Sequence, residues 1–253
     1  MLSTDDEVVK MNQTLMPIAE TIFHHQIEGG SESDEAIAPL RKQVNEGSEW
    51  LNQWVAAEAC RWLDRGVIAA IVGGEHSVPL GLIETLAGRF PGLGILHIDA
   101  HADLRDAYEG FASSHASIMF NTLKNKNIGN IIQVAIRDFC QDELDVALAD
   151  DRVKQFTDSD LNNRLFNGET LAALCDEMVG SLPPDVYISF DIDGLSPELC
   201  PNTGTPVPGG LSYRQAEYLL RQVVLSGRRI IGFDLCEVAS GTGNDEWDAN
   251  VGA

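Results

Sequence analysis

Three short segments of this chain carry acidic and histidine side chains at spacings that could bind a metal ion. Asp99, His101 and Asp103 lie at positions i, i+2 and i+4, where the side chains of an extended segment share one face. Asp191 and Asp193 repeat the two-residue spacing. Carboxylates held on one face repel one another unless a cation neutralises them. The pattern therefore predicts a metal site, although a single D-x-D pair is more often a helix cap or a turn former.

A histidine that follows two glycines completes a set of two imidazoles and four carboxylates. The candidate metal ligands are His76, Asp99, His101, Asp103, Asp191 and Asp193. Catalytic zinc usually takes three protein ligands, so this larger set favours two ions that share bridging carboxylates. Oxygen ligands with some nitrogen and no sulfur favour Mn²⁺ over zinc or Cu(I). Such a two-metal site activates water as a nucleophile at neutral pH.

These ligands follow short apolar runs that alternate with helical periodicity. We expect strands at 67–72, 95–98, 131–136, 153–156, 186–190 and 230–235. We expect helices over 48–66 with Ser48 as N-cap, from about 78, and over 141–149, 169–179 and 212–225. Residues 1–47 are the least readable, with a helix over 15–25 and an acidic loop over 29–35. The alternation predicts one α/β domain over 1–253, with a parallel sheet whose carboxyl edge gathers the functional residues.

The net charge of the chain is strongly negative. It carries 17 Lys and Arg against 39 Asp and Glu, a formal charge of −22. Binding to nucleic acid needs clustered basic residues, so we expect no nucleic-acid partner. Cationic substrates or metal ions suit the charge better than nucleic acid does, although from the charge alone a plain solubilising surface is the favoured interpretation.

The cysteines and the N-terminus indicate a soluble, cytoplasmic protein. Five scattered cysteines form no C-x-x-C pair, which favours reduced thiols over a zinc ribbon or a disulfide framework. The first residues, MLSTDDEVVK, lack the pattern of a signal peptide. No apolar run approaches the roughly 20 residues that cross a bilayer, so we expect no membrane partner.

Four motifs together resemble the ureohydrolases, the family of arginase, agmatinase and formimidoylglutamase. They are GGEHS, DAHADLRDAYEG, SFDIDGLSPELCPNTGTPVPGG and GFDLCEV, and the resemblance covers about residues 50–253. It implies a three-layer α/β/α arginase-like fold with a mostly parallel sheet and a centre of two Mn²⁺ ions. It also implies hydrolysis of guanidinium or formimino groups, and a homo-oligomer that is a trimer or hexamer.

By position in these motifs, the resemblance assigns roles to individual residues. One manganese would be held by His76, Asp99, Asp103 and Asp191. The other would be held by Asp99, His101, Asp191 and Asp193. His115 matches the proton-shuttle histidine, and Glu237 matches the carboxylate that pairs with the guanidinium; Asp103 counts as catalytic as well as a ligand. A carboxylate facing a planar cation gains two parallel charge-assisted hydrogen bonds, which suits the role of Glu237.

Three histidines outside this set receive structural interpretations. We interpret His24 and His25 as a surface pair and His97 as a core histidine within its apolar strand. The segment 203–210, rich in Gly and Pro, is expected to form a rigid loop near the site, or simply to connect a strand to a helix.

The chain departs from the family pattern at four places. Glu75 stands where the family usually has Asp, and Ser196 stands where it commonly has a further Asp. The family's N-terminal strand is not recognisable in 1–47, and the chain stops at Ala253, before the expected final helix.

The substrate follows less directly from the motifs. Arginases place Asn where this chain has Arg105, and the surrounding pattern looks more like agmatinases, so agmatine is the leading substrate. Arg105 would also suit the acidic tail of a formimidoylglutamase or guanidino-acid substrate, unless Asp106 and Glu109 neutralise it. A single-zinc deacetylase of related fold would need a tandem histidine pair, and a calcineurin-type phosphatase would need a GNH motif. A catalytically silent binding or scaffold subunit is the non-enzyme alternative.

Overall fold

The computed structural model of the chain describes residues 5–243 and 245–253, and it contains a six-stranded sheet. The strand order is β1-β6-β5-β2-β3-β4, and all neighbouring strands are parallel. The strands are β1 (Ala69–Val72), β2 (Leu93–Ile98), β3 (Ile128–Ile136), β4 (Val153–Thr157), β5 (Asp185–Asp191) and β6 (Arg229–Cys236).

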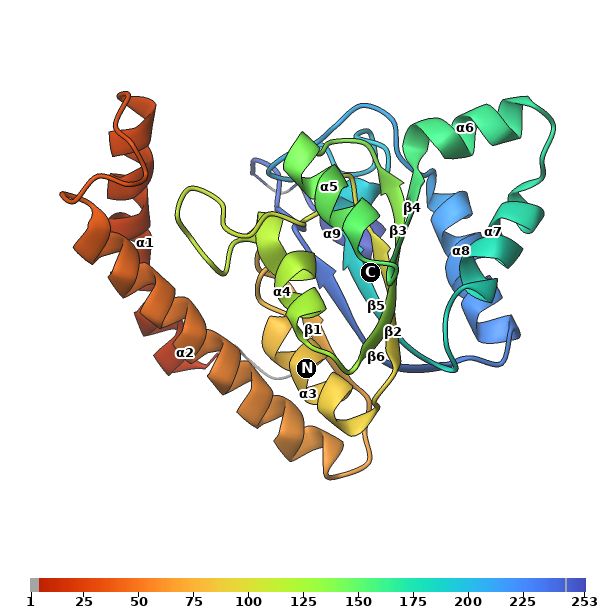
Figure 1. Ribbon diagram of the computed structural model, residues 1–253, viewed down its shortest axis with the longest axis horizontal. Coiled ribbons are helices and arrows are strands. Elements are labelled where there is room, and N and C mark those ends of the chain that lie inside the picture. Colours follow the sequence, from red (N-terminus) through yellow and green to blue (C-terminus); the bar gives the residue numbers. More distant parts are fainter. Residues whose placement is uncertain (1–4, 244) are drawn as a thin grey trace.

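Helices cover both faces of this sheet (Figure 1). The helices are α1 (Asp6–Ile27), α2 (Ala38–Leu63), α3 (Leu80–Arg89), α4 (Ile118–Lys124), α5 (Gln141–Ala149), α6 (Asp158–Phe166), α7 (Leu171–Gly180), α8 (Tyr213–Leu225) and α9 (Trp247–Gly252). One buried cluster joins the sheet to α2–α5, and a second joins it to α6–α8. Side chains of β2 alternate between the two clusters, as the period of two requires. The three-layer α/β/α prediction is confirmed.

Most predicted elements are present, and the differences lie mainly at their ends. All six expected strands form, although β1 begins at Ala69 rather than at residue 67. The expected N-cap, Ser48, lies inside α2, which begins ten residues earlier beside a proline in its first turn. The Oγ of Ser48 donates back to the Val44 carbonyl at 3.2 Å instead of capping the helix. Helix α1 is longer than the segment 15–25, and α4, α6 and α9 were not predicted.

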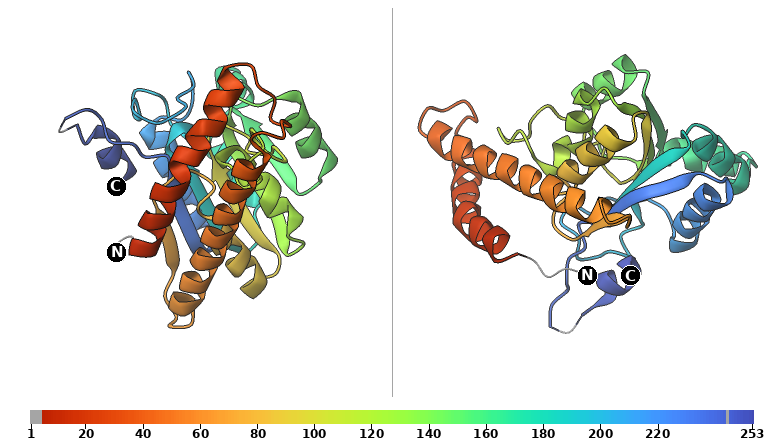
Figure 2. Two further views of the ribbon diagram at one scale, coloured as in Figure 1. Left: turned by 90° about the vertical axis from the view of Figure 1, so that its left-hand side faces the viewer. Right: turned by 90° about the horizontal axis from the view of Figure 1, so that it is seen from below.

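The N-terminal helices form a hairpin that stands beside the sheet and supports a loop of the site. Figure 2 shows α1 and α2 joined at an end that projects from the main body, with α2 running from there onto the main body. From this hairpin, Gln26 Nε2 donates to the Glu109 carbonyl at 3.2 Å and Asn45 Nδ2 donates to the Gly110 carbonyl at 3.2 Å. The hairpin thereby holds the loop that leads to His115. No helix within residues 5–243 and 245–253 is long and apolar enough to cross a membrane.

We predict opposite effects for two glycine substitutions on α3. A Cβ on Gly81 would collide with the Asn52 carbonyl of α2, whereas a Cβ on the exposed Gly88 would meet no atom within 4 Å. Gly81→Ala should lower the free energy of unfolding by about 1–3 kcal/mol through overpacking. Gly88→Ala should raise it by about 0.5–1 kcal/mol, because alanine favours a helix over glycine. Urea denaturation followed by circular dichroism measures both, and equal changes in the two variants would contradict the close packing of α2 on α3.

Candidate metal centre

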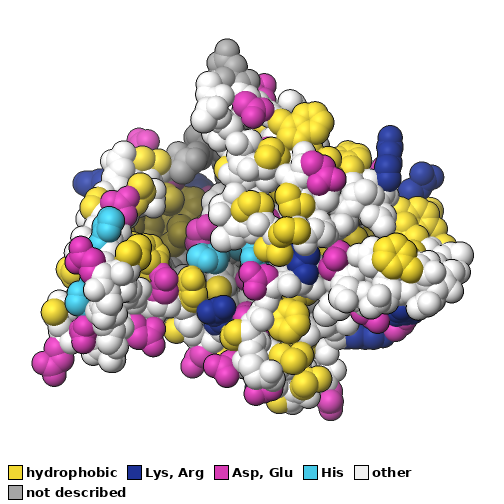
Figure 3. Space-filling view, turned by 90° about the horizontal axis from the view of Figure 1, so that it is seen from above, with side chains coloured by type: hydrophobic (Ala, Val, Ile, Leu, Met, Phe, Trp, Pro, Cys, Tyr) yellow, Lys and Arg dark blue, Asp and Glu magenta, His cyan; other side chains and the backbone are white. Residues whose placement is uncertain are grey.

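The predicted ligands converge because neighbouring parallel strands end together. Ile98 of β2 pairs in register with Phe190 of β5, so Asp99 and Asp191 follow at the same level. These two strands lie at the point where the strand order reverses, with later crossovers running outward on either side. Ligand sites of open α/β sheets form at such a reversal, beyond the carboxyl ends of the strands. Seen from this edge in Figure 3, histidine side chains lie among acidic side chains beside a hollow.

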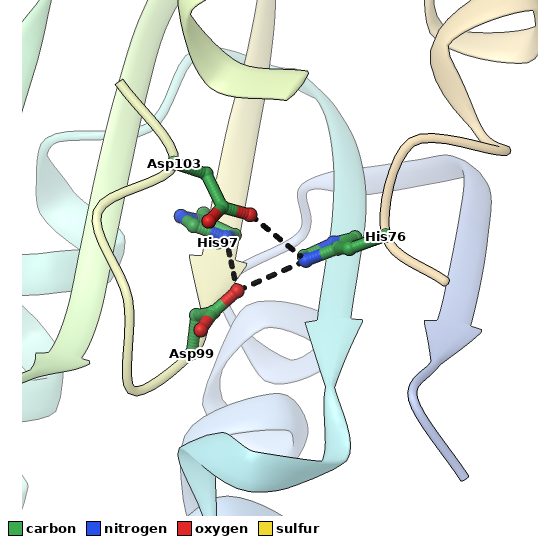
Figure 4. Close-up of side chains that lie close together, drawn as sticks. All are labelled: His76, His97, Asp99 and Asp103. Carbon is green, nitrogen blue, oxygen red and sulfur yellow. Dashed lines mark hydrogen bonds and ion pairs between the residues drawn. The ribbon is translucent and has the colours of Figure 1, made fainter. Parts of the chain in front are cut away.

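The first group of ligands surrounds one nitrogen of His76 (Figure 4). His76 Nδ1 lies 2.9 Å from Asp99 Oδ2, 3.2 Å from Asp103 Oδ2 and 3.3 Å from Asp191 Oδ2. All four side chains are buried, with at most 4% of each side chain exposed. The structure therefore brings together the four residues expected at one metal ion.

The second group surrounds His101. His101 Nδ1 lies 3.1 Å from Asp193 Oδ2 and 3.3 Å from Asp99 Oδ1. Asp99 thus presents its two oxygens to different groups, which is the arrangement expected of a bridging carboxylate. The structure joins Asp191 to the first group only, since its Oδ1 accepts the Asp193 backbone N–H at 2.9 Å.

The chemistry of these donors fits divalent cations. Asp103 Oδ2 is buried and accepts no hydrogen bond within the described chain. A single ring N–H of His76 cannot satisfy three carboxylates, and an unpaired buried charge costs several kcal/mol. Two cations, one per group, would compensate the carboxylates and take both imidazoles as ligands. Asp99 would then lie between the two cations.

Burial and neighbouring charges shift the pKa values of the Asp and His side chains in this cluster. Burial, reinforced by the charge of Asp99, raises the pKa of the Asp191 carboxyl well above its usual range and also raises the pKa of Asp103. Burial would lower the pKa of His101, but Asp193 and Asp99 outweigh it and raise that pKa to about 11. Surrounding carboxylates likewise outweigh burial and raise the pKa of His76. In the absence of cations, the neighbouring carboxylates thus favour the protonated form of both imidazoles.

Backbone strain marks two of the predicted residues. Asp103 has φ 55° and Glu237 has φ 60°, and only four non-glycine residues of the described chain have positive φ. Such conformations are costly for non-glycine residues and gather at functional sites. The conformation of Glu237 directs its carboxylate towards the first group, where Oε1 accepts the His76 backbone N–H at 3.0 Å.

Glu237 is half-buried, as expected for a residue that follows an apolar strand into the site. Burial raises the pKa of its carboxyl above the usual value, and the bond from the His76 N–H partly offsets that effect. A carboxylate oxygen has two acceptor positions, so the bond to His76 leaves Glu237 able to accept hydrogen bonds from a ligand.

His115 lies at the solvent boundary of the site. Its side chain is 45% exposed, and its Nδ1 lies 3.8 Å from Glu75 Oε2. Glu75 also accepts hydrogen bonds from the hydroxyl and the backbone N–H of Ser77. The departure at Glu75 therefore places a carboxylate beside His115, while Ser196 forms a turn that hydrogen-bonds the Leu211 carbonyl.

Arg105 has a different partner from the two predicted. Asp106 pairs with Lys124 at 3.5 Å, and Arg105 Nε instead lies 3.4 Å from the buried Glu143 Oε2. The guanidinium of Arg105 also stacks on Tyr108, 4.8 Å from the ring centroid. Glu143 caps α5 through a capping box, which places its carboxylate against Arg105. The expectation that Asp106 neutralises Arg105 is therefore wrong, and Glu109 shows no ion pair with it among the described residues.

Residues 203–210 do form a loop against the site, as expected. Thr205 Oγ1 lies 3.3 Å from Asp193 Oδ2, and Thr203 Oγ1 donates to the Glu237 carbonyl at 2.9 Å. Arg137, which follows β3, anchors this loop by donating to the carbonyls of Val207, Asp193, Leu195 and Ala135. Sequence reasoning missed Arg137, although its position directly after a strand was a usable signal.

Of the remaining histidine predictions, the one for His25 agrees with the structure and the one for His97 agrees only in part. His25 Nε2 pairs with Asp34 at 2.7 Å at the surface, consistent with a surface role rather than a ligand pair. His97 is fully buried in β2 as expected, but its Nε2 lies 2.9 Å from Asp99 Oδ2. His97 is therefore part of the cluster and not merely packing in the core.

Comparisons with known proteins match the chain to one protein family. The model of the arginase family matches residues 25–253. The N(1)-aminopropylagmatine ureohydrolase of Thermus thermophilus is 35% identical over 192 residues, covering 76% of this chain. The chain spans only 62% of the length of that relative.

Solved structures show the same fold. A hypothetical agmatinase from Burkholderia thailandensis is 25% identical with a TM-score of 0.67, over 79% of this chain and 60% of that one. The arginase of Bacillus cereus superposes with a TM-score of 0.69 at 22% identity, over 84% of this chain and 76% of that one.

We expect binding of a divalent cation to release protons from this centre. The neighbouring carboxylates raise the pKa of His101 to about 11, so this imidazole must lose a proton to become a ligand, and they raise the pKa of His76 in the same direction. Affinity should therefore rise as the pH rises from about 6 to 8. Calorimetric titration with MnCl₂ in buffers of different ionisation enthalpy measures the protons released. His101→Asn should release fewer, whereas the surface variant His24→Asn should match the parent; a heat independent of the buffer would contradict the prediction.

Proposed function

Because the chain belongs to the arginase family of hydrolases, we propose that it hydrolyses the guanidinium group of a small cationic amine, with agmatine as the leading substrate. The products would be urea and an amine. The observation that carries this proposal is the arrangement of two ligand groups that share Asp99, with the Glu237 carboxylate bound to the backbone of His76.

We propose Mn²⁺ as the metal, two ions per chain. Their ligands would be His76, Asp99, His101, Asp103, Asp191 and Asp193. These residues supply carboxylate oxygens and imidazole nitrogens without thiolate, which favours manganese. When bound, the metal pair would activate a water molecule for attack on the substrate.

The protein side chains would supply binding and proton transfer. A guanidinium held by Glu237 gains charge-assisted hydrogen bonds in a region partly shielded from water. His115 reaches solvent on one side and Glu75 on the other, which suits a group that carries a proton between the leaving amine and bulk water.

The charges around the site favour a substrate without a carboxylate tail. Glu143 already compensates Arg105, which reduces the ability of that guanidinium to bind an acidic group. The hollow beside His115 is lined by α1, α2 and β1, and the fixed charges among its described lining residues are Asp5, Glu58 and Glu75, all negative. An amine tail is therefore better compensated there than the α-carboxylate of arginine. The named activity of the Thermus thermophilus relative is consistent with a cationic tail.

The compartment and the assembly of the protein are proposed as well. All five cysteines are free thiols, which supports a reducing compartment, and we propose the cytoplasm. Assembly into a homo-oligomer is proposed from family membership alone.

We predict that Glu237 determines recognition of guanidinium. The Mn²⁺-loaded parent should release urea from agmatine with a kcat/KM at least about tenfold above that for arginine. Glu237→Gln keeps the shape but removes the charge, and should lower kcat/KM for agmatine by at least about a hundredfold, because loss of one partner of a buried pair costs about 3–5 kcal/mol. The assay measures urea, ammonia and formamide from agmatine, arginine, guanidino acids and formiminoglutamate.

The control for Glu237→Gln is Glu217→Gln, which breaks only an exposed ion pair on α8. It should leave kcat/KM unchanged within about twofold. Parent-like hydrolysis of agmatine by Glu237→Gln would remove Glu237 from the substrate contact, and preferred release of formamide from formiminoglutamate would replace the proposed substrate class.

We predict a catalytic but not a metal-binding role for His115. His115→Asn should lower kcat by about 10²–10⁴-fold, the usual contribution of general acid–base catalysis. Its manganese content should equal that of the parent by elemental analysis, because His115 lies at the rim and outside both ligand groups. His24→Asn serves as the matched surface control. Loss of metal together with activity would make His115 a ligand instead.

A further inference from the structure

A row of polar side chains crosses the sheet at one level directly beneath the metal centre. In register, Gln155 of β4 is opposite Gln133 of β3, and Gln133 is opposite His97 of β2. His97 is opposite Ser189 of β5, which is opposite Asp234 of β6. Side chains at one level of a parallel sheet share a face. The four from Gln133 to Asp234 are buried, so each polar group there needs a partner.

Hydrogen bonds join one half of this row to the shared carboxylate. Gln155 Nε2 donates to Gln133 Oε1 at 2.8 Å, and Gln133 Nε2 lies 2.6 Å from the Ala102 carbonyl oxygen. The same Gln133 Nε2 lies 3.0 Å from His97 Nδ1, and His97 Nε2 lies 2.9 Å from Asp99 Oδ2. Figure 4 shows the His97 ring directed at Asp99 from the end of β2.

The Ala102 carbonyl fixes which atom donates and which accepts in each of these hydrogen bonds. A carbonyl oxygen can only accept, so the Gln133 atom that faces it must be the amide nitrogen. The reversed amide would place two oxygens 2.6 Å apart. That nitrogen also faces His97 Nδ1, which must therefore accept. A neutral imidazole with Nδ1 as acceptor carries its hydrogen on Nε2, which points at Asp99.

We propose that Gln133 holds His97 in the Nε2–H tautomer, and that His97 is a positioning residue for Asp99 rather than a metal ligand. The donated hydrogen occupies one acceptor position of Asp99 Oδ2 and fixes the rotation of the carboxylate. The His101 backbone N–H donates to Asp99 Oδ1 at 2.6 Å, and the other acceptor positions of the carboxylate face the His76 ring from Oδ2 and the His101 ring from Oδ1. This inference rests on the proposed metal centre, in which Asp99 bridges the two ions.

The proposal distinguishes His97 from a ligand through its conservative variant. His97→Gln retains an N–H that can donate to Asp99, so two Mn²⁺ ions should bind with Kd values within about threefold of the parent. His97→Phe retains the volume without the donor and should raise Kd by about 10–100-fold, the usual effect of losing a hydrogen bond that orients a ligand. Calorimetry measures Kd, and electron paramagnetic resonance reports the spin coupling of the two ions in the full-length chain.

Two substitutions of glutamines in the polar row test whether Gln133 orients His97. Gln133→Leu removes the amide that fixes the tautomer and should raise Kd by about tenfold. Gln155→Leu is the matched control, because Gln133 remains fixed by the Ala102 carbonyl, and its Kd should match the parent within about threefold. Metal loss in His97→Gln equal to that in His97→Phe, with Gln133→Leu unchanged, would make His97 a ligand and overturn the proposal.

The tautomer can be measured independently of metal binding. In ¹⁵N–¹H correlation spectra of the full chain labelled with ¹⁵N-histidine, His97 should show an unprotonated Nδ1 and a protonated Nε2. A protonated Nδ1 would overturn the proposal even if the parent binds two manganese ions. A parent that binds no manganese pair but shows the expected tautomer would instead contradict the proposed function alone.

Discussion

The mutual repulsion of buried carboxylates is the constraint on which this structure depends. Asp99, Asp103, Asp191 and Asp193 lie within one nearly water-free region, each with at most 4% of its side chain exposed. Such a cluster persists only if the rest of the fold holds its members in place against their charge and if cations or bound protons compensate that charge. The strained backbone at Asp103 shows that this placement is maintained against a local conformational cost.

The sheet meets the constraint through strand register rather than through loops. Because Ile98 of β2 and Phe190 of β5 pair in register, the next residues are Asp99, directly after β2, and Asp191, the last residue of β5. The buried polar row lies at the level just before those residues and connects them to the interior through oriented hydrogen bonds. Register thus places Asp99 and Asp191, whereas His76, His101, Asp103 and Asp193 lie in the segments that follow the strands.

Features that depend on residues close together in the sequence could be predicted, whereas contacts between distant segments could not. The D-x-H-x-D and D-x-D spacings are local, so the sequence could predict that these acidic and histidine side chains gather at the strand ends. The start of α2 could not, because a proline in its first turn outweighs the capping preference of Ser48. The pairing of Arg105 with Glu143 and the bonding of His97 to Gln133 join residues from different segments of the chain. No spacing along the chain reports such pairs.

Arg137 gives the fold a form of tolerance to sequence change. Among the described residues, its guanidinium donates hydrogen bonds to main-chain carbonyls, including that of Val207 in the 203–210 loop and those of Asp193 and Leu195. A main-chain carbonyl is present whatever side chain a position carries. A change of the Val207 side chain would therefore leave its bonds to Arg137 in place, whereas Leu195 is also held by its buried side chain. Side chains of the 203–210 loop can therefore change, and with them the substrate that the site accepts. The main-chain hydrogen bonds that hold the loop against the site would remain.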